Sequence, residues 1–358
     1  MNPPVIHSWA GVRACVVGGT GFLGYQIADR LAVRGAAVRV LAPVATDDHP
    51  IHSRTDIEWV VGDVRTAAAK TFADCRAVFQ AAGPVQVGIA NQAVHLDSHT
   101  AGTCALLAAL PAGCRLVHTS SLVAIGGTHD GRILDESSPF PNGDLRIEYV
   151  RAKRTAEAAA LAAATAGADV VVTNPAYLIG PDDFGRSVMG KFCIRVWQGR
   201  VPFVTAGGYN VVDVRDAAEG HVLAAERGRT GERYVLGGEN LPLKVFVGLL
   251  TAAAGLRPRA MPTCPAWLFA AAAGLAEVRG RILGKAPYPS FEHARLNRFS
   301  WYASATKAAR ELGFAARPVT ESIGDAFRWH AARRPLTPSR FNRWWFRPPR
   351  SAPATPAP

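Results

Sequence analysis

Tyr149 and Lys153 are the residues whose types and spacing most directly suggest chemistry. Residues four apart on a helix share a face, so the Lys153 ammonium can lie beside the Tyr149 phenol and favour its ionised form. A free phenol, with a pKa of about 10, is a poor base at neutral pH, and a nearby cation brings it toward the range of a general acid or base. Alone, such a pair is more often an interface tyrosine and a solvated lysine, so its meaning depends on the surrounding elements.

A glycine-rich turn far upstream supplies that context. Gly18, Gly21 and Gly24 follow a short apolar run at 14–17 that is typical of a buried strand, and the residues behind them recur at helical spacing. Glycine permits a tight turn and a close approach to a pyrophosphate, and the helix offers free N–H groups and a positive dipole end. The spacing has one residue more than the common G-x-G-x-x-G pattern between its first two glycines. Strand, turn, helix and a second strand together predict a dinucleotide site and, with Tyr149, hydride transfer.

The remaining pattern predicts an α/β fold with a doubly wound parallel sheet, because strand and helix signals alternate through the first half. After Pro175 the alternation becomes irregular, which indicates a smaller, mostly C-terminal substrate lobe. The expected domains are a dinucleotide-binding unit at 1–180, a substrate lobe at 181–334 with segments near 209–238 returning to the first unit, and a tail at 335–358. The active site should lie between the lobes, at the carboxyl ends of the strands.

Composition agrees with a globular, cytoplasmic enzyme. The chain has 358 residues, of which 49% are hydrophobic, and a chain of this length buries a large core. Six cysteines are scattered without a C-x-x-C pair and without a secretory leader, so we expect reduced thiols. His49 and His52 have no matching second cluster, so no metal site is expected.

From about Arg13 to Arg334 the chain resembles the extended short-chain dehydrogenase/reductases, also called the NAD-dependent epimerase/dehydratase superfamily. Four further segments carry the resemblance: Gly-Asp-Val at 62–64, Phe-Gln-Ala-Ala-Gly at 79–83, Thr-Ser-Ser at 119–121, and Asn-Pro-Ala-Tyr-Leu-Ile-Gly-Pro at 174–181. Each segment is weak alone, but their order and spacing are specific. The resemblance implies a Rossmann-type fold and NAD or NADP as the cofactor.

The resemblance also implies a catalytic set of Ser121, Tyr149 and Lys153. Tyr149 would exchange a proton with the substrate oxygen, and Ser121, preferred over Ser120, would hydrogen-bond that oxygen. Lys153 would hold the nicotinamide ribose and lower the pKa of Tyr149, while hydride moves between substrate and nicotinamide. The expected cofactor-binding residues are Gly18, Gly21, Phe22, Leu23, Gly24, Asp63, Val64, Ala81, Ala82, Gly83, Thr119, Tyr149, Lys153, Pro175 and Leu178.

Two departures from the family pattern leave questions open. At 42–43, where the family places an acid for NAD or a base for NADP, this chain has Ala-Pro. Arg39, His49 or Arg54 could reach a 2′-phosphate, whereas two aspartates in the same loop argue the other way. His99 stands where the family often has asparagine, and both a proton-relay role and a packing role are open.

The closest resemblance, over 174–238, is to bacterial proteins labelled hopanoid-associated sugar epimerases, relatives of dihydroflavonol reductases and 3β-hydroxysteroid dehydrogenases. We expect an NAD(P)-dependent oxidoreductase that interconverts a secondary alcohol and a ketone on a large, partly apolar substrate, such as a sterol, isoprenoid or flavanone. The alternative is a nucleotide-sugar epimerase or dehydratase with tightly held NAD, for which a diphosphate would need cations. A non-catalytic redox sensor is disfavoured because the proton-transfer set is complete. The candidate cations, which could equally be a solvated helix face, are Arg186, Lys191, Arg195 and Arg200.

Two surfaces could contact partners. The apolar stretch 265–276 is too short to span a bilayer and is either a helix covering the substrate pocket or an interfacial helix admitting a lipid-like substrate. The tail contributes to the net charge of +12 and suits peripheral contact with the inner membrane face, a solvated or self-packed end, or, with no supporting module, nucleic acid. The basic and aromatic residues of the C-terminal region, which begins before the tail, are Arg328, Arg333, Arg334, Arg340, Arg343, Arg347 and Arg350, with Trp344, Trp345 and Phe346. The resemblance further implies a homodimer through the Tyr149 helix, at Ala156, Ala158, Ala159 and Ala160.

Overall fold

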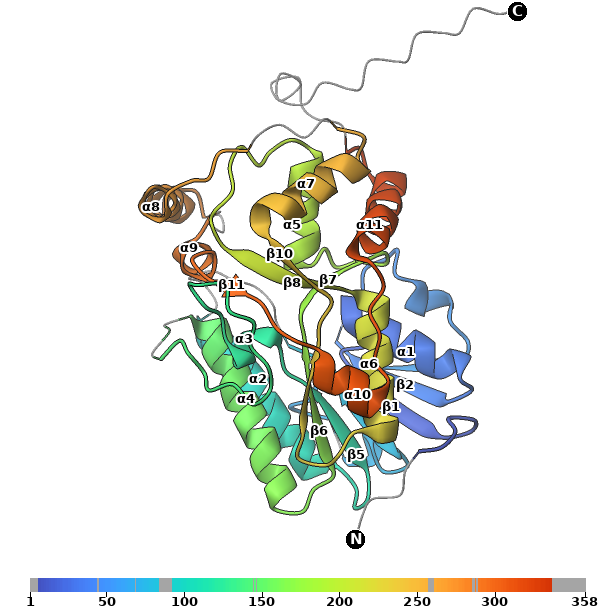
Figure 1. Ribbon diagram of the computed structural model, residues 1–358. Helices are drawn as coiled ribbons and strands as arrows, with labels where there is room; N and C mark the ends of the chain where they lie inside the picture. The colour runs from blue at the N-terminus through green and yellow to red at the C-terminus, as the bar shows by residue number, and fades with distance from the viewer. Residues whose placement is uncertain are drawn as a thin grey trace, which may run out of the picture.

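The computed structural model describes residues 6–336, except 44, 68, 84–91, 144, 146, 257–260, 285–286 and 288, and the side chains of 92–98. An α/β unit occupies the lower half of Figure 1, and a smaller lobe lies above it. The tail arginines from Arg340 onward and the aromatic residues at 344–346 lie outside the described residues. Of the tail residues that are described, Arg333 lies over the Trp329 ring, 4.2 Å from its centroid.

The main sheet has seven parallel strands in the order β3-β2-β1-β4-β5-β6-β9. Its central strands are buried along almost their whole length, as expected for strands that are covered on both faces. The predicted α/β class with a doubly wound parallel sheet is confirmed. The strands are β1 (Arg13–Val17), β2 (Ala37–Ala42), β3 (Ile57–Val61), β4 (Ala77–Gln80), β5 (Arg115–Thr119), β6 (Val170–Pro175) and β9 (Arg233–Leu236).

Two pairs of helices cover this sheet. On one side α1 (Phe22–Val33) packs against α6 (Val214–Arg227), and α2 (Gln92–Ala109) packs against α4 (Glu148–Thr165). Ala156 and Ala160 of α4 are buried inside the protomer, so these two alanines are not available to a twin helix. The homodimer therefore remains a prediction from resemblance.

The smaller lobe is built on a second sheet, in which β8 (Gly208–Asp213) pairs with β7 (Tyr177–Ile179), β10 (Glu239–Pro242) and β11 (Ser300–Trp301). Its core lies among α5 (Val188–Trp197), α7 (Leu243–Ala253) and α11 (Val319–Arg333). The Trp197 side chain is fully buried there and donates to the main-chain oxygen of Leu250 over 3.0 Å.

The segments near 209–238 were expected to return to the main unit, and one element among them, β8, lies in the smaller lobe. β8 belongs to the second sheet, and the return begins only with α6 and is completed when β9 pairs with β6. The reason is that β7 leaves the main sheet directly after β6 and offers β8 a nearby edge. An apolar run in the sequence indicates a strand but not the edge that the strand will pair with.

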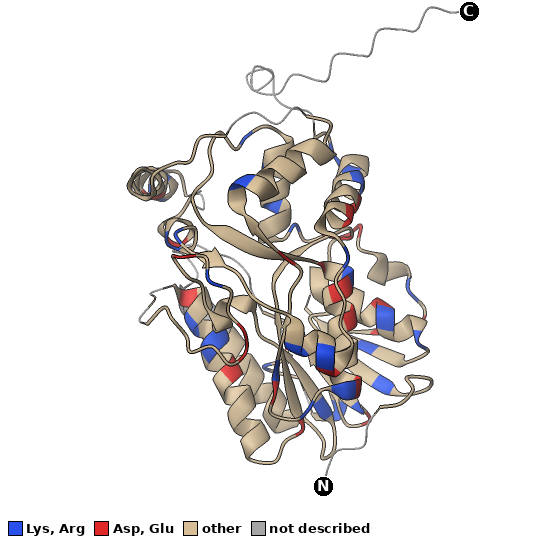
Figure 2. Cartoon of the chain, in the orientation of Figure 1, with Lys and Arg blue, Asp and Glu red and all other residues tan. Residues whose placement is uncertain are grey.

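The remaining elements are short, except for α8. They are α3 (Leu122–Ile125), α8 (Ala266–Leu283), α9 (Phe291–Leu296), α10 (Thr306–Leu312) and the 3₁₀ turns at Pro50–Ser53 and Ala69–Thr71. α10 packs on α6, where acidic and basic positions lie close together (Figure 2). Within the described part of the chain, no helix is long and apolar enough to cross a membrane.

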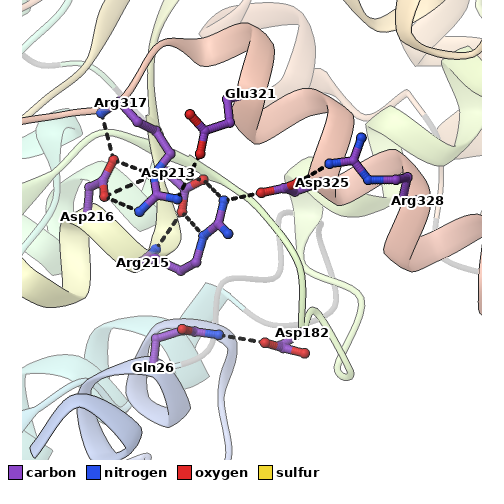
Figure 3. Close-up of polar contacts among 9 residues, drawn as sticks. All are labelled: Gln26, Asp182, Asp213, Arg215, Asp216, Arg317, Glu321, Asp325 and Arg328. Atoms are coloured by element: carbon purple, nitrogen blue, oxygen red, sulfur yellow. Dashed lines mark hydrogen bonds and ion pairs between the residues drawn. The ribbon is translucent and has the colours of Figure 1, made fainter. Parts of the chain in front are cut away.

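An ion-pair network joins the two units at the start of α6 (Figure 3). Asp213 accepts from the main-chain N–H of Arg215 and pairs with its guanidinium, which also reaches Asp325 of α11 over 2.6 Å. The guanidinium of Arg317, just before α11, donates to the Asp216 carboxylate through both Nε and Nη2. Burial raises the pKa of Asp213, but the hydrogen bonds from Arg215 outweigh it and hold that pKa below its usual value. The network therefore keeps α11 and its lobe against the main unit.

Candidate active site

The glycine turn closes the gap between β1 and α1. Gly18 has φ +82°, and a Cβ there would lie 2.7 Å from the main chain of Ala82, so only glycine fits this approach. A Cβ at Gly24 would lie 2.2 Å from the Gly18 oxygen, which shows how closely α1 starts against the turn. No side chain caps α1 at Gly21. The first N–H groups and the positive dipole end of α1 therefore suit a pyrophosphate.

The loop after β4 lies beside this turn, at the point where the strand order reverses. Ala81 donates its N–H to the Val17 oxygen over 2.9 Å, which joins the carboxyl ends of β1 and β4. Gly83 has φ +152°, and a Cβ there would overlap the His99 ring at 2.0 Å. In doubly wound folds a dinucleotide binds in this crevice. The structure therefore places Ala81, Ala82 and Gly83 beside Gly18.

Four other predicted cofactor residues lie in the segments around this crevice. Phe22 and Leu178 both line a small cavity between the main unit and the smaller lobe. Asp63 follows β3 and pairs with Arg65 over 2.6 Å, and this hydrogen bond holds the pKa of Asp63 below its usual value. Val64 faces α2, since a Cβ at Gly102 would lie 3.3 Å from it.

Two of the cations that could reach a 2′-phosphate are already engaged. Arg39 pairs with Glu58 and Asp74, each over 3.0 Å, from the middle of β2. Arg54 pairs with Asp29 and Asp56, each over 2.6 Å. Each guanidinium is therefore bound to two carboxylates.

Ser121, Tyr149 and Lys153 meet at the carboxyl end of β5. Ser121 caps α3, and a hydrogen bond joins it to the phenol of Tyr149 at the start of α4. Lys153 lies one turn farther along α4 and donates to the main-chain oxygen of Thr119 over 3.0 Å. The sequence spacing alone predicted that Tyr149 and Lys153 share a face, and the end of β5 brings Thr119 and Ser121 to that face.

Burial controls the protonation of this group. It raises the pKa of Tyr149 to about 12, against a smaller lowering by the hydrogen bond with Ser121. Burial also lowers the pKa of Lys153 to about 8, and the negative charge of Glu157 partly offsets this effect. The direction for Tyr149 is opposite to the lowering that the spacing predicted, because loss of hydration dominates. The phenol therefore keeps its proton at neutral pH, and Lys153 keeps its charge up to about pH 8.

Glu157 and Asn174 support this group, and the sequence analysis missed both. Glu157 is buried, lies one turn beyond Lys153 on α4, and receives a 2.6 Å hydrogen bond from Asn174 and a 3.0 Å ion pair from Arg233. Asn174, near the end of β6, also donates to the main-chain oxygen of Ser121 over 3.1 Å. The four-residue spacing from Tyr149 to Lys153 continues to Glu157, and this was the available signal.

Two histidines pack around the catalytic candidates. His221 lies under β5 and β6 and contacts the hydroxyls of Thr119 and Thr173 at 3.1 and 2.9 Å. Burial lowers the pKa of His221 to about 4, so it stays neutral and serves as a fixed support. The His99 ring stands edge-on to Tyr149, with centroids 6.0 Å apart. This position is compatible with both roles predicted for His99.

The smaller lobe places aromatic side chains near the site and arginines near two of its histidines. Tyr177 packs on Tyr209 with ring centroids 4.3 Å apart. Burial raises the pKa of Tyr177, and the nearby Tyr209 and Tyr149 phenols add to this effect. Arg195 lies close enough to His293 of α9 to lower its pKa, whereas Arg186 acts on His330 of α11. Arg186 thus acts on His330 together with Arg333 and Arg334.

His49 and His52 are both engaged by neighbouring groups. His49 is buried against Tyr25 and accepts from the N–H of Ile51, and His52 contacts the Thr46 oxygen. Across the residues that the structure describes, no three or more His, Cys, Asp or Glu side chains are grouped to hold a metal ion. All six cysteines are free thiols.

Comparison with known proteins agrees with this geometry. Residues 14–237 match the family described as the NAD dependent epimerase/dehydratase family. The chain is 33% identical over 333 residues to a Synechocystis protein provisionally named dihydroflavonol 4-reductase, covering 90% of this chain and 96% of the relative. It is 28% identical over 326 residues to sterol demethylase protein B of Methylococcus capsulatus, covering 89% and 98%. The solved structure of gox2253 has 29% identity and a TM-score of 0.77, covering 89% of this chain and 98% of that one.

Proposed function

Because the chain belongs to the NAD-dependent epimerase/dehydratase family and is an NAD(P)-dependent enzyme, we propose that it interconverts a secondary alcohol and a ketone on a large, partly apolar substrate. One observation carries this proposal. The Ser121 hydroxyl and the Tyr149 phenol are hydrogen-bonded to each other at the carboxyl end of β5, next to the buried ammonium of Lys153. Two hydroxyls that share a hydrogen bond can both reach one substrate oxygen.

The proposed mechanism assigns each group one task. The glycine turn and the first N–H groups of α1 would hold the pyrophosphate of the dinucleotide. The nicotinamide, when bound, supplies or accepts the hydride. In the reduction direction Tyr149 donates its proton to the carbonyl oxygen, which becomes the product hydroxyl, and Ser121 holds that oxygen. Lys153 binds the ribose hydroxyls and, by its charge, favours the phenolate that remains.

The residues near β2 support NAD as the preferred cofactor. Ala42 is buried at the end of β2 and provides neither a carboxylate nor a cation. Arg39 and Arg54 are each held by two carboxylates, and moving either toward a 2′-phosphate would break both pairs. Because no acid replaces them, we expect the preference over NADP to be modest.

The substrate class rests on the relatives and on the lining of the site. One relative is named for sterol demethylation, and the Tyr177 and Tyr209 rings lie in contact near the site, tilted by 37° to each other. These observations support an apolar ring system or chain as the substrate.

The test measures the loss of reduced nicotinamide absorbance with NADH or NADPH and a panel of steroid, flavanone and isoprenoid ketones. We expect turnover with at least one ketone, abolished by Tyr149→Phe and retained by Tyr234→Phe. Tyr234 is a suitable control because its hydroxyl binds Glu311 of α10 and none of the catalytic candidates. Cofactor that co-purifies with the protein and reacts with no ketone would contradict the proposal and direct attention to nucleotide sugars.

A further inference from the structure

Helix α8 leaves a large apolar surface in contact with water. Only Ala273 and Glu277 of this helix are buried. Six large apolar side chains on α8 are between 47% and 77% exposed, whereas monomeric proteins rarely expose contiguous patches of this kind without a function. They are Trp267, Leu268, Leu275, Val278, Ile282 and Leu283. We call this set the α8 patch.

The α8 patch lies on the opposite side of the helix from its packing contacts. Leu268, Leu275 and Ile282 are seven residues apart in succession and therefore lie along one face. Ala273 and Glu277, four apart, lie on the other face, where Glu277 accepts from the N–H of Phe291 over 2.9 Å. In Figure 1 α8 stands at the outer edge of the molecule, next to α9. The patch is therefore a true helix face rather than a set of scattered exposed side chains.

The sequence in and around α8 is basic. Between residues 255 and 290 the sequence carries five basic residues and one acid. The acid is Glu277, which is buried and bonded to α9. Arg279 and Arg281, by contrast, are exposed on α8 beside the apolar side chains. Arg279 lies on the same face as Leu275 and Ile282, and Arg281 lies at the border of that face. An apolar helix face with arginines whose charged ends can reach lipid phosphates, and with a tryptophan at one end, is the pattern of a helix that lies in the headgroup region of an anionic bilayer.

We propose that α8 docks on an anionic phospholipid membrane. The α8 patch enters the boundary between headgroups and acyl chains, and the Arg279 and Arg281 guanidinium groups bind lipid phosphates. The helix lies in the plane of the membrane, since it is not long and apolar enough to span it. The membrane-facing region is therefore an element of the smaller lobe, in addition to any contribution of the tail.

Two carboxylates connect this docking helix with the candidate active site. Glu277 of α8 binds the first N–H of α9, and Glu292 of α9 binds the first N–H of α4, at Glu148, over 3.3 Å. Tyr149 is the next residue. If the proposed function holds, an apolar substrate would leave the bilayer close to the helix that carries its proton donor. Docking itself does not depend on that function.

The experiment is co-sedimentation of the full chain with vesicles of phosphatidylcholine, with and without phosphatidylglycerol. We expect binding to the phosphatidylglycerol vesicles that weakens with added salt. Leu275→Glu and Ile282→Glu should each reduce partitioning onto the vesicles about tenfold, since each replaces an apolar side chain that enters the bilayer with a charged one. Val33→Glu, at a valine on α1 that is 80% exposed, is the matched control and should bind like the wild type.

Three results would overturn the proposal. One is equal binding by wild type, Leu275→Glu and Ile282→Glu. Another is binding that persists in those variants and is lost when residues 337–358 are removed, which would assign the contact to the tail. The third is a wild-type dimer in sedimentation velocity that Leu275→Glu converts to a monomer, without any vesicle binding, because the patch would then cover a second copy. Vesicle binding is scored without turnover, so a failure of ketone reduction leaves this result unaffected.

Discussion

Asn174 joins Glu157 to the catalytic segment: its amide nitrogen lies 2.6 Å from a carboxylate oxygen of Glu157 and 3.1 Å from the main-chain oxygen of Ser121. One side chain near the end of β6 thus holds both α4 and the start of α3. Because α4 carries Tyr149 and Lys153, Asn174 and Glu157 are positioning residues for all three catalytic candidates. The buried charge of Glu157 also acts on Lys153 across one helical turn.

The pH dependence of ketone reduction should depend on the charge of Glu157. Lys153 has a pKa of about 8, so we expect kcat/KM to fall above about pH 8 as the ammonium loses its proton. Glu157 raises the pKa of Lys153, so Glu157→Gln should move this alkaline limb to lower pH. Glutamine still accepts a hydrogen bond from Asn174, which limits any structural change.

Glu219→Gln is the control for the pH profile, because Glu219 pairs with Arg30 of α1 and with Arg34 directly after α1, and lies far along the chain from the catalytic helix. The same alkaline limb in wild type and Glu157→Gln would show that Lys153 does not govern the decrease.

Ser121 and Ser120 can be separated by a pair of alanine variants. The Ser121 hydroxyl is hydrogen-bonded to Tyr149, whereas the Ser120 hydroxyl is buried without a hydrogen-bond partner among the described residues. We expect Ser121→Ala to lower kcat roughly 100- to 1,000-fold with little change in KM, as loss of an oxyanion contact does. Ser120→Ala should leave steady-state kinetics nearly unchanged. A larger loss for Ser120→Ala would reverse the assignment.

The burial of the charged Lys153 side chain should lower the free energy of unfolding. Its pKa falls from 10.5 to about 8 on folding, which corresponds to roughly 3 kcal/mol against the charged form. Lys153→Met removes this cost and loses one hydrogen bond to Thr119, so we expect an inactive protein that is more stable by on the order of 2 kcal/mol at pH 7. Because the depressed folded-state pKa makes the wild type gain stability as the pH rises from 8 to 10, the difference should shrink over that range. Urea denaturation at pH 7 and pH 9.5 measures both effects.

Lys307→Met is the matched control, since Lys307 pairs with Glu232 over 2.6 Å and its side chain is only 18% exposed. This variant should not be more stable than the wild type. A Lys153→Met protein that unfolds at lower urea than the wild type would contradict the cost assigned to Lys153.

Gly24 should tolerate no side chain. A Cβ there would meet the Gly18 oxygen at 2.2 Å, so Gly24→Ala must displace α1 from the turn. We expect at least a tenfold weaker NADH affinity by fluorescence titration and a stability loss of about 2 kcal/mol. Gly248 in α7 has open space around its Cβ position, and Gly248→Ala should instead stabilise by about 0.5–1 kcal/mol with unchanged NADH affinity. Equal NADH affinity and equal stability of the two variants would show that the turn can rearrange to accept a side chain at position 24.

The sequence predicted those parts of the site that depend on local spacing. The glycine turn follows from residues within one β-α unit, and the Tyr149–Lys153 pair follows from one helical turn. The link from Asn174 to Glu157 joins β6 and α4 through tertiary packing, which a linear pattern does not contain. The direction of the Tyr149 pKa was missed for the same reason, since burial is set by surrounding elements. An apolar run such as α8 likewise shows hydrophobicity but not whether the protein covers it.

The position of β9 has a consequence for biosynthesis. When a nascent chain has been synthesised as far as residue 180, strands β1 to β6 are present. β9, which pairs with the outer edge of β6, follows about fifty residues later. Until then β6 presents unpaired N–H and C=O groups, which can recruit another chain. We therefore expect a fragment of residues 1–180 to aggregate when expressed alone, and translation through β9 to be the point at which the dinucleotide unit can close.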